Sequence, residues 1–160
     1  MQSDGLLRET PEQVADGNPE SIVSEISDRE VGAEVRFIGR VRELEQTADE
    51  RQKPLSHLEL EHYPDMTAAC LLEICQRAIG QFAPQAIYIA HRVGSITVGE
   101  DVVLVEAHAS HRKAAFQSCD FVMDFLKTSA PFWKKAVFTD GSERWIEQRE
   151  RDRQAAINWS

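Results

Sequence analysis

The sequence predicts an α+β fold in which a mainly antiparallel sheet packs against helices as a two-layer sandwich. Alternating apolar and polar residues, the period-two pattern of half-buried strands, recur over 31–42, 56–63, 85–93 and 101–109. Apolar residues at helical spacing occupy 64–82 and 110–129. Because two strands precede each helix, we expect two β-hairpins, each followed by a helix, together with a small extra β subdomain.

Length and charge limit the classes of protein to consider. The chain has 160 residues and a mass of 18.1 kDa, which suits one domain. We expect 1–18, rich in Pro, Gly and acidic residues, to be a flexible lead-in, and 19–160 to form a single domain. A formal net charge of −9 disfavours nucleic acid and anionic membranes, so an anion would need a local basic pocket. Without an apolar run of about 20 residues or a signal peptide, a cytoplasmic protein is predicted.

The first half of the domain begins with a short helix that Asn18 or Ser21 could cap and that ends near residue 26. The strand over 31–42 follows. Residues 43–55 are charged, end in Pro54 and show no period, so we expect an exposed loop. This loop should join the strands over 31–42 and 56–63 into the first hairpin.

The second half starts with Pro64, which suits the first position of a helix. Gly80 and Pro84 are expected to end that helix. The strands over 85–93 and 101–109 should form the second hairpin through a turn over 94–100. Ser110 is the expected N-cap of the next helix. A short strand over 133–139 and a charged tail over 142–153, held by Trp145 and Ile146, complete the chain.

A sharp corner follows the second helix. Pro131 cannot continue a helix, so the helix must end near Ser129, which leaves Lys127 in its last turn and Lys134 just past the corner. Two ammonium groups held close lower each other's pKa unless an anion lies between them. The corner is therefore a candidate anion site or source of a reactive amine. Alternatively, Lys127 simply favours the helix C-terminus and pairs with Asp124.

Other reactive side chains give weaker signals. Three cysteines lie in apolar helical patterns, and we interpret them as reduced core residues. His108 and His111 flank a strand-to-helix junction without an acid or thiol to complete a set, so we predict no metal. His111, Arg112 and Lys113 at a helix N-terminus favour a phosphate, or are merely a solvated basic turn. Hydrolase, P-loop and dinucleotide motifs are missing. The remaining candidates are the cations Arg42, His111, Arg112, Lys127, Lys134 and Arg149.

Several motifs together carry a family resemblance. The segment 127–134 reads KTSAPFWK, and further matching strings occupy 37–42, 60–66, 91–94, 110–112, 121–134 and 144–145. In order and spacing they resemble the large, catalytic subunit of molybdopterin synthase over about residues 30 to 158. The resemblance implies the hammerhead-like arrangement of that family.

The resemblance also implies a reaction and its partners. Family members transfer sulfur to cyclic pyranopterin monophosphate and so form the dithiolene of molybdopterin. The donor is the C-terminal Gly-Gly thiocarboxylate of a small ubiquitin-like subunit. Members are heterotetramers built on a large-subunit homodimer, whose sites can borrow residues from the neighbouring protomer. No metal or other cofactor is implied.

Site residues follow from the motif match. Lys127 and Lys134 fall on the catalytic lysines, and Arg42, His111, Arg112 and Arg149 on positions associated with the substrate or the donor tail. Lys134 suits a general acid or base and Lys127 an orienting charge, although these roles could be exchanged. Met123, one turn before Lys127, is expected to line the apolar side of the pocket.

Two positions depart from the family pattern. Ala136 stands where some members carry Glu, and Ser129 replaces a basic residue of some relatives. A hypothesis from another class also stays open, because the same cationic groove could bind an acidic or Gly-Gly-ended tail without catalysis. The presence of both lysines favours the sulfurtransferase, since tail recognition alone would not need two.

Overall fold

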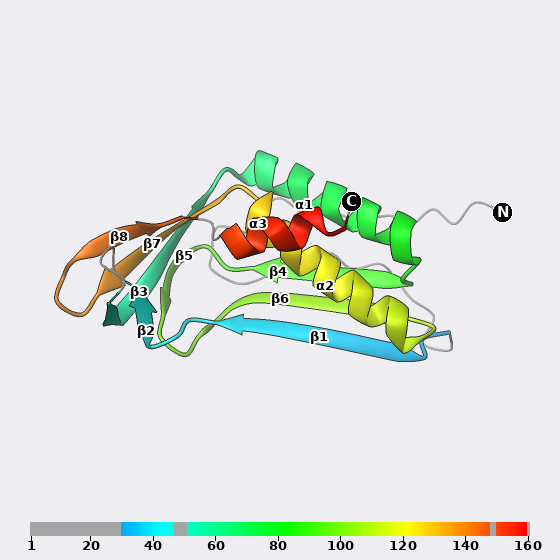
Figure 1. The fold of residues 1–160 in the computed structure, drawn as a ribbon, viewed down its shortest axis with the longest axis horizontal. Coiled ribbons are helices and arrows are strands. Elements are labelled where there is room, and N and C mark those ends of the chain that lie inside the picture. Colours follow the sequence, from blue (N-terminus) through cyan, green and yellow to red (C-terminus); the bar gives the residue numbers. More distant parts are fainter. Residues whose placement is uncertain (1–29, 47–50, 148–149, 160) are drawn as a thin grey trace.

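The computed structural model describes residues 30–46, 51–147 and 150–159, which form two antiparallel sheets and three helices (Figure 1). The first sheet has the order β1-β6-β4 and contains β1 (Ala33–Arg40), β6 (Asp101–Ala109) and β4 (Ala86–His91). The second has the order β2-β3-β7-β8, with a further strand, β5 (Gly94–Thr97), paired to β3. Its strands are β2 (Leu44–Gln46), β3 (Gln52–His62), β7 (Phe132–Phe138) and β8 (Glu143–Ile146). The helices are α1 (Pro64–Phe82), α2 (Arg112–Thr128) and α3 (Glu150–Ile157).

The predicted α+β class with antiparallel sheets is confirmed, but only one predicted hairpin forms. β4 pairs antiparallel with β6, with Ile89 opposite Val105. The expected first hairpin is wrong, because β1 pairs with β6 and β3 pairs with β7, more than 60 residues away in sequence. An alternating pattern shows that a segment is a strand and which face it buries, but it does not name the partner strand. The two predicted strands belong to different sheets.

The expected loop over 43–55 is largely extended chain. Leu44 pairs with Pro54 and Glu45 with Lys53, so β2 and the start of β3 form a short hairpin, and 47–50 lie outside the described residues. The turn expected over 94–100 likewise contains β5, which pairs with β3. Both segments are short and mostly exposed, so burial imposes little alternation on their sequences.

Local chemistry accounts for the helix ends. Pro64 begins α1 as predicted, while Gly80 lies inside the helix and Ala83, in the left-handed region at φ 50°, caps it. The N-cap of α2 is His111, not Ser110. At the other end the Ser129 N–H donates to the Phe125 carbonyl at 2.8 Å, which confirms the predicted end.

One core fills the space between the helices and the first sheet, and a smaller one lies under the second sheet. Figure 1 shows the helices over one face of β1, β6 and β4. Cys75 and Cys119 are buried and free, as predicted, and Cys70 is half-buried. Burial raises the pKa of Cys75 to about 12 and that of Cys119 to about 11. These thiols are core residues and not nucleophiles at neutral pH.

The tail is held differently from the prediction. Trp145 is 51% exposed, so of the two expected anchors only Ile146 packs on the core. Trp159 anchors α3 instead, because its indole N–H donates to Asp124 at 2.8 Å and its ring meets Phe82 edge-on. The lead-in over 1–18, the helix expected to end near residue 26 and Arg149 lie outside the described residues. Within the described part of the chain, no helix is long and apolar enough to cross a membrane.

Candidate active site

The corner between α2 and β7 brings two lysines together. Lys127 ends the last turn of α2, and Lys134 lies on β7 opposite Leu60 and Ile146. Pro131 stands between them, and the chain reverses there. Burial lowers the pKa of Lys134, and the charge of Lys127 lowers it further. The two lysines are thus electrostatic neighbours, as the corner predicted, and the pKa of Lys134 lies below its ordinary value.

Carboxylates on α3 and β2 offset part of the positive charge of the two lysines. Asp152 on α3 lies 4.0 Å from the Lys127 ammonium, and both Asp152 and Glu45 raise the pKa of Lys134 against the larger lowering effects. Glu45 on β2 also pairs with Arg42, at 3.2 Å from its guanidinium. Glu45 therefore links Arg42, one of the predicted site residues, to the surroundings of Lys134.

The alternative pairing of Lys127 with Asp124 is not the one observed. Asp124 accepts the Trp159 indole N–H, and Asp152 takes the place beside Lys127. Sequence reasoning missed both Asp152 and Glu45. Each lies in a charged segment without periodicity. The local sequence of such a segment does not show which of its carboxylates will contact the lysines in the folded chain.

His91 is a third residue that sequence reasoning left without a role. Its ring stacks on that of Phe132, and its Nδ1 lies 2.9 Å from the Arg92 carbonyl. A carbonyl oxygen only accepts, so Nδ1 carries the proton. Burial lowers the pKa of His91 to about 4, and the nearby charge of Lys134 contributes. A neutral imidazole therefore lines the site beside the lysines.

The remaining predicted residues divide between the two ends of α2. Met123 is half-buried one turn before Lys127 and packs against the first core. His111 and Arg112 lie at the opposite end of the helix. At a rise of 1.5 Å per residue, the 15 residues from Arg112 to Lys127 span about 22 Å. Within one chain, His111 and Arg112 are thus not part of the lysine site.

The family model described as MoaE protein matches residues 13–129, which is most of the chain. The chain belongs to the MoaE family. It is 45% identical over 130 residues to a Vibrio cholerae protein named molybdopterin synthase catalytic subunit, covering 81% of this chain and 83% of that one.

Solved structures of the family have the same fold. A Burkholderia ambifaria molybdopterin biosynthesis MoaE protein superposes with a TM-score of 0.66 at 42% identity, covering 82% of each chain. The molybdopterin synthase of Staphylococcus aureus gives a TM-score of 0.68 at 27% identity, covering 76% of this chain and 84% of that one. The resemblance of the sequence motifs to this family is confirmed.

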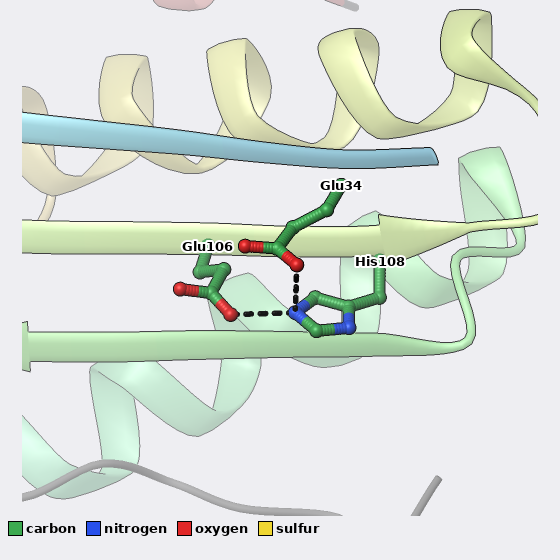
Figure 2. Close-up of side chains that lie close together, drawn as sticks. All are labelled: Glu34, Glu106 and His108. Atoms are coloured by element: carbon green, nitrogen blue, oxygen red, sulfur yellow. Dashed lines mark hydrogen bonds and ion pairs between the residues drawn. The ribbon is translucent and has the colours of Figure 1, made fainter. Parts of the chain in front are cut away.

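A second polar cluster in this MoaE-family chain surrounds one ring nitrogen of His108. It corrects the expectation that no acid lies near this histidine. Figure 2 shows Glu34 and Glu106 beside its ring, with Nε2 2.6 Å from Glu106 and 4.0 Å from Glu34. Two acids therefore do lie beside His108, and the cluster that they form among the described residues does not include His111. Arg36 donates to both carboxylates, at 2.6 Å to Glu106 and 3.3 Å to Glu34. Because this guanidinium already balances the carboxylates, we interpret the cluster as an ion-pair network and assign it no metal.

Proposed function

We propose that this chain is the catalytic subunit of a molybdopterin synthase, a sulfurtransferase of molybdenum cofactor biosynthesis. It transfers sulfur from the C-terminal thiocarboxylate of a small ubiquitin-like subunit to cyclic pyranopterin monophosphate, and so forms the dithiolene of molybdopterin. The observation that carries this proposal is the half-buried Lys134 beside Lys127, in a family whose members bear that name.

The two lysines suit different steps of sulfur transfer. A lowered pKa brings Lys134 closer to neutral pH, where an amine can both give and take a proton, so Lys134 is the general acid or base. Lys127 is 45% exposed at its side chain and ends a helix that opens on the corner. Its ammonium orients the thiocarboxylate and stabilises negative charge as sulfur attacks the pterin side chain. Arg42 extends the positive surface toward the substrate phosphate.

The distance along α2 supports a site shared between two protomers. His111 and Arg112 lie about 22 Å from Lys127 along the helix axis, so they serve this reaction by completing the site of a neighbouring copy. No described element covers the face of the first sheet opposite the helices, where Ile38 is 43% exposed (Figure 1). That face suits self-association, and the assembly is a homodimer within a heterotetramer with two small subunits.

The small subunit reaches the site with its tail. Glycine has no side chain, so a Gly-Gly terminus can enter a narrow channel and end beside Lys127 and Lys134. Arg149, outside the described residues, remains part of the proposed tail or substrate site. We place the reaction in the cytoplasm and expect no metal or redox cofactor.

Reconstitution tests the proposal. The purified chain, a thiocarboxylated small subunit and the pyranopterin substrate should yield the dithiolene product, and Lys127→Ala should nearly abolish it. Lys53→Ala is the matched control, since Lys53 is a partly exposed lysine paired with Asp140 and should keep full activity. Product formation by Lys127→Ala at the wild-type rate would refute the catalytic site. Tail binding without product in the wild-type chain would favour the non-catalytic binding module.

A further inference from the structure

A hollow of about 280 Å³ lies on the second sheet, lined by Glu61, His62, Tyr63, Trp133 and Trp145. Glu61 pairs with Trp133 across β3 and β7, and Lys135 pairs with Trp145 across β7 and β8. Directly paired residues project from the same face of a sheet, and neighbours along a strand project from opposite faces. Glu61, Trp133 and Trp145 therefore project from the face opposite to that of Lys134, whereas His62, which pairs with Phe132, projects from the Lys134 face. A cation held between Glu61 and the two indole rings thus lies on the other side of the sheet from the Lys134 side chain.

Aromatic rings dominate this hollow and remain open to solvent. Tyr63 is 61% exposed, Trp145 51% and Trp133 44%. The Tyr63 and Trp133 rings meet edge to face, with centroids 5.2 Å apart, which leaves ring surface free for a ligand. Clustered exposed Trp and Tyr side chains are typical of binding surfaces, where they contribute most of the affinity.

The charges around the rings favour a cation. Among the described residues, the Glu61 carboxylate has no hydrogen-bond or ion-pair partner. Burial lowers the pKa of His62, so its imidazole stays uncharged at neutral pH and does not repel a cation. Aromatic faces attract cations. A carboxylate at the rim of the hollow can form an ion pair with the same cation.

The same face already holds one cation in this manner. The Lys135 ammonium lies 5.8 Å from the centroid of the Trp145 ring and is paired with Glu59 at 2.6 Å and Glu143 at 3.4 Å. Ring and carboxylates together thus bind an ammonium group beside the hollow. Within the hollow, no cationic side chain of the described part of the chain pairs with Glu61 or stacks on Trp133.

We propose that this hollow binds the guanidinium group of an arginine side chain presented by a partner protein. A planar guanidinium can stack on the face of Trp133 or Trp145 while its N–H groups donate in pairs to Glu61, a combination that the compact, strongly hydrated ammonium of lysine does not match. The net charge of −9 draws a basic partner toward the chain at long range.

The indole N–H signals of the full ¹⁵N-labelled chain provide the test. The chain has three tryptophans. Trp133 and Trp145 line the hollow, and Trp159, bonded to Asp124, is an internal reference. The probe is the capped tripeptide acetyl-Gly-Arg-Gly-amide, and Trp133→Phe and Trp145→Phe assign the signals. We expect the Trp133 and Trp145 signals to shift saturably, with a millimolar dissociation constant, while that of Trp159 stays in place.

Matched probes and variants make the result decisive. The citrulline tripeptide has nearly the same shape without the charge and should not bind, and the lysine tripeptide should bind more weakly. Glu61→Gln should weaken binding several-fold, whereas Glu73→Gln, the same change at an exposed site on α1, should not. Equal binding of the citrulline peptide, or equal effects of the two variants, would overturn the proposal. Free arginine carries a carboxylate of its own that Glu61 should repel. Free arginine binding as tightly as the capped peptide would therefore overturn the assignment to an arginine side chain within a protein.

Discussion

The imidazole ring of His91 lies flat against the phenyl ring of Phe132, with ring centroids 3.9 Å apart and an angle of 14° between the planes. Phe132 and Lys134 are two residues apart on β7 and project from the same face. His91 therefore packs beside Lys134 without a charge of its own.

Replacing His91 with a residue that does not titrate should make the free energy of unfolding depend less on pH in the acid range. The pKa of His91 is about 4 in the folded chain, against about 6.5 when unfolded. Between these values the unfolded chain binds a proton that the folded chain does not, so stability falls as pH falls, by up to about 3 kcal/mol. His91→Phe, which keeps a ring on Phe132, should lose less stability between pH 7 and pH 4.5 in urea unfolding. His57→Gln, at a histidine paired with Glu59, is the control and should keep the steeper dependence. An unchanged slope in His91→Phe would contradict the depressed pKa.

Neutralising the two neighbours of Lys134 should move its pKa in opposite directions. Lys127 lowers that pKa and Asp152 raises it. Lys127→Met should therefore raise the pKa of Lys134, and Asp152→Asn should lower it further. The ¹³Cε shift of Lys134, followed in a pH titration of each variant, measures both effects. In Asp152→Asn, the step of the pH–activity profile that reports the titration of Lys134 should also move to lower pH. Shifts of the same sign would disprove this arrangement of charges.

Mixing two inactive variants should restore activity if each site draws on both protomers. Arg112→Ala removes a residue that a chain contributes to the site of its neighbour. Lys127→Ala removes a residue that a chain contributes to its own site. Random exchange makes half of the dimers mixed, each with one intact site, so about a quarter of wild-type product formation should return. A mixture of Arg112→Ala with His111→Ala is the control and should recover nothing, because both variants damage the same end of α2. No recovery in the first mixture, after exchange has been verified by mass, would mean that the site is not shared.

Two glycines should respond oppositely to alanine. Gly80 lies inside α1 with no atom near the place of a Cβ, so Gly80→Ala should stabilise the chain by about 0.5–1 kcal/mol, because glycine is the poorer helix former. A Cβ at Gly32 would collide with the Ser110 carbonyl oxygen, which is rigid backbone. Gly32→Ala should therefore destabilise the chain by about 1–3 kcal/mol. Urea unfolding of both variants at one pH measures the difference, and a stabilising Gly32→Ala would contradict the close approach.

The local order of the chain could be predicted from its sequence. Pro64 begins α1, Pro131 forces the end of α2 near Ser129, and the alternation over 101–109 predicts β6, because backbone geometry and one-sided burial act on neighbouring residues. The corner that joins Lys127 to Lys134 could be predicted for the same reason. It needs only a helix, a proline and a strand that follow one another.

Only the tertiary structure decided which distant segments meet. β1 pairs with β6 instead of β3, Trp159 rather than Trp145 anchors α3, and Asp152 and Glu45 balance the charge of Lys134. The structure also separates Arg112 from Lys127 by the length of α2. Strand partners and charge neighbours depend on contacts between residues far apart in sequence. The free energy of such contacts comes from the packing of the whole domain, and no local pattern of residues records it.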